Sequence, residues 1–178
     1  VGEYWDGLKP IQRWLDGTEQ TSRAFDFPTF YELKKLLENR DYPGLQNLTR
    51  SDSPGLLGRR PAQGVTFLEN HDTGFPQHSS DTYPQEGPLL MQGYAFILTH
   101  PGVPCVYWKH YFEWQRGPAI AQLIKARKKA GIHDQSSVAT RIEQGSYVAE
   151  VGSNLVVKIG PALWQPDPTV FALEASGQ

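Results

Sequence analysis

The sequence predicts an α/β fold with a parallel sheet, followed by a small antiparallel β module. Segments with helical spacing of apolar residues alternate with short β-rich runs through the first part of the chain. One of these runs, residues 103–108, is apolar throughout, as expected for a strand buried on both faces of a parallel sheet. After Gly131 the helical pattern ends, and short strands joined by Gly-containing turns replace it.

The first predicted helix follows a short extended segment at residues 25–28. Thr29 and Glu32 have the S/T-x-x-E spacing of a capping box, and apolar residues continue at helical spacing up to about Asn39. Asp26 is expected to cap or brace the turn before this helix. Residues 40–64 are rich in Gly, Pro, Ser, Asn and Arg, which predicts a long loop.

The next elements are a strand, a loop and a second helix. The β-rich run through Phe67 predicts a strand, and a polar loop follows from residue 73 to 87. Apolar residues share one face of a predicted helix at 88–99, and residues 100–102, His-Pro-Gly, are its stop signal. The apolar strand at 103–108 then contains Cys105, which is interpreted as a small buried hydrophobe.

The third predicted helix opens at Pro118 and closes at Gly131, after a basic last turn. Three short strands follow it, at residues 138–142, 146–151 and 154–159. We therefore expect two domains: residues 1–131 form the α/β part and residues 132–178 form the small antiparallel part. His133 is assigned to the hinge between them.

Composition excludes several classes of protein. The 178 residues carry 17 Lys and Arg against 19 Asp and Glu, so no nucleic acid or anionic membrane surface is expected as a partner. A single cysteine allows no internal disulfide, and no apolar run approaches the roughly 20 residues of a membrane span. The first residue is Val1 and no signal peptide is recognisable, so the chain is expected to be a mature product or a fragment.

The strongest candidate site is the pair His71-Asp72, which directly follows a predicted strand. In a (β/α) barrel the loops after the strands line the active-site face, although a polar turn is the alternative for this pair. Glu3, beside Tyr4 and Trp5, is a second candidate at a strand end. Two carboxylates across a cleft suit acid/base chemistry on a glycosidic bond. Aromatic walls would desolvate one of them, raise its pKa and suit it to be the general acid.

These segments resemble the α-amylase family of retaining glycoside hydrolases, and its plant-type branch in particular. The resemblance keeps its order along nearly the whole chain. It is carried by Val-Gly-Glu-Tyr-Trp (1–5), Ala-Phe-Asp-Phe-Pro-Thr (24–29), Val-Thr-Phe-Leu-Glu-Asn-His-Asp-Thr-Gly (65–74), Met-Gln-Gly-Tyr-Ala-Phe-Ile-Leu-Thr-His-Pro-Gly-Val-Pro-Cys-Val-Tyr (91–107), Gly-Ile-His (131–133) and Val-Val-Lys-Ile-Gly-Pro (156–161).

The resemblance implies a site and a substrate. Glu3 would be the catalytic acid/base, and Asp72 would be the catalytic residue that stabilises the oxocarbenium-like transition state through sugar hydroxyls. His71, Trp5 and Asn70 would bind the substrate, an α-1,4-glucan such as starch. Trp164 would either be a sugar-stacking platform on the small domain or be buried in its core. The resemblance also suggests an extracellular protein.

The resemblance also implies what this chain lacks. The family's nucleophilic Asp lies in a Gly-Phe-Arg-x-Asp-type motif upstream of the Val-Gly-Glu segment, and this chain has no such motif. No cofactor is expected in this chain, and the calcium of intact members would be held by the absent region. The fold is then the second half of a (β/α)8 barrel, truncated, followed by most of a β-sandwich-like domain. Lys109 stands where the family usually has Asp.

Half a barrel would expose sheet edges and an apolar face. Either a missing N-terminal half covers them or the chain associates with itself. Three functions stay open: an α-amylase-type hydrolase with weak activity as an isolated chain, a non-catalytic glucan-binding remnant, and a transglycosylase that uses the same carboxylates.

Overall fold

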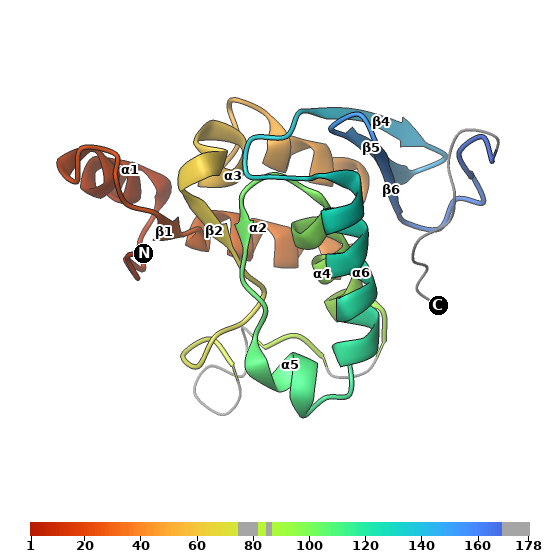
Figure 1. The fold of residues 1–178 in the computed structure, drawn as a ribbon, viewed down its shortest axis with the longest axis horizontal. Helices are drawn as coiled ribbons and strands as arrows, with labels where there is room; N and C mark the ends of the chain where they lie inside the picture. Colours follow the sequence, from red (N-terminus) through yellow and green to blue (C-terminus); the bar gives the residue numbers. More distant parts are fainter. Residues whose placement is uncertain (75–81, 85–86, 169–178) are drawn as a thin grey trace.

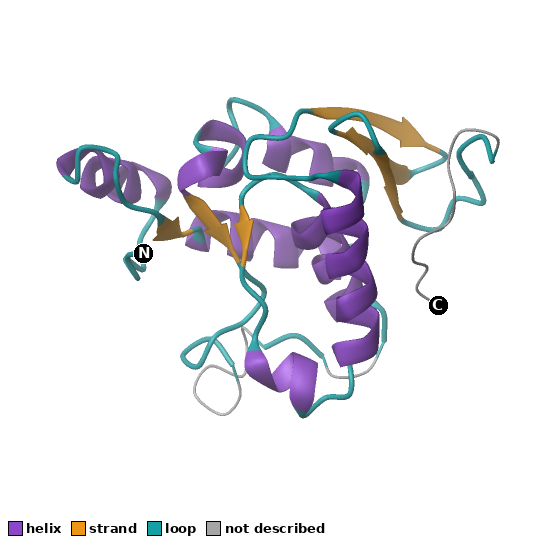
Figure 2. Cartoon of the chain, in the orientation of Figure 1, coloured by secondary structure: helices purple, strands orange, loops and turns teal. Residues whose placement is uncertain are grey.

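A parallel sheet and an antiparallel sheet organise the chain, and helices lie around them (Figure 1 and Figure 2). The computed structural model describes residues 1–74, 82–84 and 87–168. The parallel sheet has the order β1 (Ala24–Phe25), β2 (Gly64–Thr66), β3 (Val103–Pro104). None of the described helices is long and apolar enough to cross a membrane.

The N-terminal segment extends this sheet beside β1. Gly2 forms a parallel bridge with Ala24, in which the Gly2 amide donates to the Arg23 carbonyl at 2.7 Å and the Phe25 amide donates to the Gly2 carbonyl at 3.1 Å. A Cβ at Gly2 would lie 2.3 Å from the Trp14 ring, so a residue with a side chain would displace this ring. Glu3 therefore leaves the sheet at the end where β1 and β2 also finish.

Helix α1 (Leu8–Gly17) was not predicted from the sequence. Its buried side chains Ile11 and Leu15 pack with Ala24 and Leu56 in a small cluster of their own. The helix lies at the far left of Figure 1. Leu8, Ile11, Trp14 and Leu15 recur at helical spacing on its packed face, so the sequence carried a signal for this helix that went unrecognised.

Helix α2 (Phe27–Glu38) begins earlier than the predicted capping box requires. Asp26 is the N-cap, and its carboxylate accepts from the amide of Thr29 at 3.2 Å. Thr29 is inside the first turn, so the Thr29 and Glu32 capping box is wrong. The assignment of Asp26 as a capping residue is confirmed, and the helix ends at the predicted position, with Asn39 as its C-cap.

Residues 40–64 fold into short helices and not into one long loop. They form η1 (Pro43–Thr49), α3 (Leu56–Arg59) and η2 (Pro61–Gln63) before β2 begins. Four leucines of this segment are fully or almost fully buried: Leu45, Leu48, Leu56 and Leu57. The Gly and Pro content concealed these turns because each is shorter than the window in which a helical period can be recognised.

Helix α4 (Leu89–Thr99) confirms the second predicted helix, and its C-cap is His100. The predicted strand at 103–108 is much too long, because β3 has two half-buried residues and α5 (Trp108–Phe112) starts at the sixth. The Cys105 amide still donates to the Thr66 carbonyl of β2 at 2.7 Å. Cys105 is half-buried at the margin of the core and not inside it. Most of the predicted loop at 73–87 lies outside the described residues.

Helix α6 (Gly117–Ala130) confirms the third predicted helix, with Pro118 in its first turn and Gly131 as a left-handed C-cap at φ 69°. The antiparallel sheet then follows as predicted, with strands β4 (Val138–Glu143), β5 (Ser146–Val151) and β6 (Leu155–Ile159). One hydrophobic core reaches from the buried face of β5 to the helices of the first part. Trp164 is half-buried, and the Arg141 guanidinium lies 4.8 Å from the centre of its ring.

Candidate functional site

The candidate site is formed where the N-terminal segment and the segment after β2 leave the parallel sheet. The first contributes Glu3, one residue beyond the bridge at Gly2. The second contributes the turn 70–74, which follows the buried residues Phe67 and Leu68. Because the strands run parallel, their carboxyl ends meet at one edge of the sheet, and residues 67 positions apart in sequence become neighbours.

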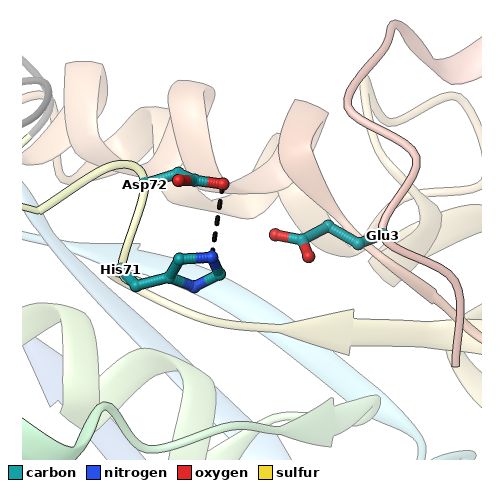
Figure 3. A group of neighbouring side chains, drawn as sticks. All are labelled: Glu3, His71 and Asp72. Carbon is teal, nitrogen blue, oxygen red and sulfur yellow. Dashed lines mark ion pairs between the residues drawn. The ribbon is translucent and has the colours of Figure 1, made fainter.

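Glu3, His71 and Asp72 form one cluster. One ligand-type atom of each lies within 4.8 Å of the corresponding atoms of the other two. His71 Nε2 is 3.5 Å from Asp72 Oδ2, and the two side chains are 75% and 46% exposed. Figure 3 shows the Glu3 carboxylate pointing toward the space between the imidazole and the Asp72 carboxylate. The structure thus brings together three of the five residues that the sequence analysis selected.

Asn70, the fourth selected residue, organises the turn. Its Oδ1 accepts from the amides of Asp72 at 3.0 Å and Thr73 at 2.7 Å, and its Nδ2 donates to Glu3 Oε1 at 3.3 Å. The amide side chain therefore orients Asp72 and links the turn to Glu3. These bonds use Asn70 Oδ1 and one of the two Nδ2 hydrogens, which leaves the second hydrogen for a substrate.

Trp5, the fifth selected residue, is fixed on helix α2. Its ring stacks on Phe27 with centroids 5.0 Å apart and 9° between the planes, and its Nε1 donates to the Tyr31 hydroxyl at 3.1 Å. The side chain stays 41% exposed, and Tyr4 is 40% exposed. Glu3 is itself exposed, so the expectation that these aromatic rings would desolvate its carboxyl is wrong for this chain.

Glu69, which the sequence analysis missed, is a buried carboxylate directly before the site turn. Its residue is 3% exposed, its Oε2 accepts from the Tyr83 amide at 3.0 Å, and the same oxygen lies 3.3 Å from Nε2 of buried His110. A Cβ on Gly74 would lie 2.6 Å from Glu69 Oε1, so the end of the turn packs against this carboxylate. The sequence signal that could have identified Glu69 is its position as a charged residue directly after the apolar residues 67–68.

The three clustered side chains do not fit a calcium site. Ca²⁺ takes about six to eight oxygen ligands. The cluster offers two carboxylates and one imidazole, all at least partly exposed to solvent. Among the residues that the structure describes, this is the group of three or more such side chains that could hold a metal ion. No chemical step in this chain is therefore assigned to calcium.

Several other polar residues named in the sequence analysis lie outside this cluster. Lys109 is in helix α5, and His133 follows α6. His100 is fully buried at the end of α4, where its Nδ1 contacts the Phe96 carbonyl at 2.8 Å and its Nε2 contacts the Tyr147 hydroxyl at 2.8 Å. Burial lowers the pKa of His100 to about 4. The assignment of His100 to the helix stop is therefore confirmed.

The arrangement supplies one exposed carboxylate that can exchange a proton with a bound molecule, together with an imidazole and a second carboxylate that can bind hydroxyl groups. The three groups lie within 4.8 Å of one another, so one small polar molecule could contact all of them. No nucleophile is assigned among the clustered groups, because the resemblance gives Asp72 a stabilising role.

Comparisons with known proteins relate this chain to α-amylases and identify its small domain. Residues 129–178 match the model of the alpha-amylase C-terminal beta-sheet domain. The chain is 36% identical to probable alpha-amylase 2 of Arabidopsis thaliana, across 99% of this chain and 46% of that protein. It is 39% identical to a glucan 1,4-alpha-maltotetraohydrolase of Stutzerimonas stutzeri, across 93% of this chain and 32% of that protein.

The match to a barley protein covers most of that protein's sequence. The chain is 40% identical to the alpha-amylase type B isozyme of Hordeum vulgare, across 64% of this chain and 72% of that sequence. By contrast, the chain spans about half the length of the Arabidopsis relative, at 46%. Identity at this level, together with the matched C-terminal domain, shows that this chain belongs to the α-amylase family.

Proposed function

We propose that this chain takes part in the hydrolysis of α-1,4-glucosidic bonds of starch-like glucans, with retention of configuration at the anomeric carbon. The observation that carries the proposal is the meeting of Glu3, His71 and Asp72 within 4.8 Å at the carboxyl edge of the parallel sheet. Membership of the α-amylase family supplies the reaction class.

Glu3 is the acid/base in this proposal. In the first step its carboxyl group donates a proton to the glycosidic oxygen as the bond to the anomeric carbon breaks and a nucleophilic carboxylate attacks that carbon. In the second step the Glu3 carboxylate removes a proton from water, which then displaces the enzyme carboxylate from the sugar. Its exposure allows it to exchange protons with solvent between the steps.

Asp72 and His71 bind the sugar at the cleaved bond. The Asp72 carboxylate accepts from sugar hydroxyls, and its negative charge stabilises the positive charge that develops on the sugar ring. The hydrogen bond from the Asp72 backbone amide to Asn70 Oδ1 holds the backbone that bears this carboxylate. His71 lies beside it and presents Nε2 to the same sugar.

The nucleophile comes from residues that this chain does not contain. Support comes from the absence of the family's nucleophile motif in this sequence and from the 46% coverage of the Arabidopsis relative. The bridge at Gly2 and strands β1, β2 and β3 would be four consecutive strands of a (β/α)8 barrel, its second half. A missing half, or another chain, would then cover the open edge beside β3.

Release of reducing sugar from soluble starch tests the proposal. For the isolated chain we expect slow turnover, because water must attack the anomeric carbon directly when the nucleophilic carboxylate is absent. Glu3→Gln should lower this turnover further by about 100-fold or more, because general acid catalysis is lost. Asp72→Asn should also lower it. Asp52→Asn is a matched control, because Asp52 pairs with Arg50 on the surface and belongs to a different segment. Equal activity of Glu3→Gln and the control would contradict the proposal.

Glucan binding without cleavage is the second candidate. The exposed aromatic pair Tyr4 and Trp5 beside the site favours it, since sugar rings stack on such side chains. This function predicts retention on glucan affinity gels with no product, and equal retention of Glu3→Gln. A transglycosylase would instead give longer oligosaccharides from a short donor, and product analysis separates it from a hydrolase.

A further inference from the structure

A buried polar network connects the candidate site to two other parts of the chain. Glu69 precedes the site turn, His110 belongs to α5 and Tyr94 belongs to α4. His110 Nε2 lies 3.3 Å from Glu69 Oε2, with side chains 0% and 1% exposed. His110 Nδ1 lies 2.8 Å from the Tyr94 hydroxyl. Buried carboxylates are costly unless other groups compensate their charge, so this network calls for a function.

The hydrogen bonds indicate which atoms of the network carry the hydrogens. The Tyr107 amide donates to the Tyr94 hydroxyl oxygen at 3.2 Å, so the Tyr94 O–H is free to donate to His110 Nδ1. Burial raises the pKa of Tyr94, which keeps that proton in place. With Nδ1 as the acceptor, a neutral imidazole carries its hydrogen on Nε2, which faces the Glu69 carboxylate.

The Glu69 carboxylate supports the site turn, residues 70–74. It receives the Tyr83 amide at 3.0 Å, and its Oε1 packs so closely against Gly74 that a Cβ there would approach to 2.6 Å. The Gly74 amide donates back to the Asn70 carbonyl at 2.9 Å, which closes the turn. The position of this carboxylate therefore sets the position of residues 70–74.

We propose that Glu69 and His110 form a positioning pair, anchored through Tyr94 on α4, that holds the turn bearing Asn70, His71 and Asp72 opposite Glu3. Neither residue touches the substrate, so both act through the turn. The inference rests on the proposed function for what the turn does, but the mechanical role of the pair is independent of any reaction. Among the described residues Nε2 of His110 has no hydrogen bond of regular geometry, and the carboxylate that it faces is that of Glu69, with Oε2 at 3.3 Å.

Hydrogen exchange of the turn amides tests the pair without any substrate. The amides of Asp72, Thr73 and Gly74 donate to Asn70, so their exchange reports opening of the turn. His110→Phe removes both ring nitrogens and leaves the Glu69 carboxylate buried without its partner. We expect these three amides to exchange at least about fivefold faster at a temperature where the variant is fully folded.

His100→Phe is the matched control. His100 is equally buried and also contacts a tyrosine, but its partner Tyr147 lies in the antiparallel sheet. This variant should lower overall stability while leaving the exchange of the turn amides unchanged. Equal acceleration in both variants, or none in His110→Phe, would overturn the proposal.

Two further variants test the pair if His110→Phe does not fold. Tyr94→Phe removes only the hydroxyl that orients His110, and it should accelerate the same amides by a smaller factor. Glu69→Gln keeps a hydrogen-bond acceptor for Tyr83 and His110, and it should restore most of the protection lost in Glu69→Ala. No difference between the Gln and Ala variants would count against the pair.

The tautomer of His110 gives an independent readout. Long-range ¹⁵N spectra should show hydrogen on Nε2 and none on Nδ1. The opposite tautomer would overturn the proposal, because it leaves two lone pairs facing each other. All these measurements are made without glucan, so a chain that fails to hydrolyse starch can still confirm the pair, and a disordered turn can be recognised apart from a wrong reaction.

Discussion

Single residues in this chain take their roles from what surrounds them, as the buried histidines show. His100 donates from Nδ1 to the Phe96 carbonyl, so its Nε2 accepts from Tyr147. His110 Nδ1 lies 2.8 Å from the Tyr94 hydroxyl, and its Nε2 faces Glu69. In the network that we propose, these two identical side chains, each next to a tyrosine, carry their hydrogen on opposite nitrogens. The partner that accepts the hydrogen determines whether the ring serves the helix end or the site turn.

The pH dependence of stability should report the buried His100. Burial lowers its pKa in the folded chain from 6.5 to about 4. Between these values the unfolded chain binds a proton and the folded chain does not, so the unfolding free energy falls as the pH falls from 6.5 to about 4. The stabilisation is fully present above that window. We expect a loss of about 3 kcal/mol across it, measured by urea unfolding.

Two variants isolate the His100 contribution. His100→Gln has no group that titrates in this window, so the stability difference between the unmodified chain and this variant should shrink toward acid. His133 is largely exposed and serves as the control. His133→Gln should follow the unmodified chain in parallel. A constant difference between the unmodified chain and His100→Gln would contradict the expected titration.

Elements in this fold are defined at their ends by single residues. Asp26 ends the β1 turn and caps α2, and it also accepts from the amides of Leu56 at 3.0 Å and Leu57 at 2.8 Å in α3. One carboxylate thus satisfies free amides at the starts of two helices. Gly131 plays the corresponding role at the end of α6, where the chain turns through a left-handed conformation.

Substitution of Gly131 should cost backbone strain and nothing else. Its φ is 69°, and a Cβ built there meets no atom within 4 Å. Gly131→Ala should therefore destabilise the chain by about 1 kcal/mol, the cost of the left-handed conformation for a residue with a side chain. Thermal or urea unfolding measures it.

Gly7→Ala is the control for that substitution. Gly7 also has no atom within 4 Å of an added Cβ, but its φ of −70° suits any residue. Its stability should change by less than about 0.5 kcal/mol. A cost at Gly7 as large as that at Gly131 would show that conformation is not the cause.

Element prediction succeeded where the local signals were complete and failed where contacts between segments decide. Helices α4 and α6 carry periodic apolar faces and clear stop signals, and the three antiparallel strands are separated by Gly-containing turns. The long strand predicted at 103–108 failed because apolar composition does not distinguish a strand from a strand followed by a helix. Helix α1 packs on Ala24, which follows it closely in sequence, and on Leu56, which lies much further along the chain.

The molecule as a whole has one main core and one smaller cluster. The main core includes Phe67 beside the parallel sheet, Tyr94 and Phe96 of α4, and Tyr147 of the antiparallel sheet. The smaller cluster joins α1 to the rest through Ala24 and Leu56. We therefore expect both sheets to unfold together and α1 to open at a lower free energy.

Tyr147→Phe tests this coupling. The change removes the hydroxyl that bonds to His100, so a buried nitrogen loses its partner. Hydrogen exchange should show the amides of α4 and β5 both opening about 1 kcal/mol more readily, with the α1 amides unaffected. Tyr4→Phe changes an exposed hydroxyl and is the control. A response confined to β5 would mean that the two sheets unfold separately.

The sequence by itself determined the family, the order of α/β and antiparallel segments, and the residues of the candidate site. These follow from short local patterns, namely helical period, caps, turn residues and motifs of a few positions. Only the tertiary structure decided that Glu3 meets His71 and Asp72, that Asn70 donates to Glu3, and that Glu69 and His110 form a buried pair. The reason is physical: these contacts join residues about 40 to 70 positions apart, and which of them meet depends on how parallel strands and their helices pack.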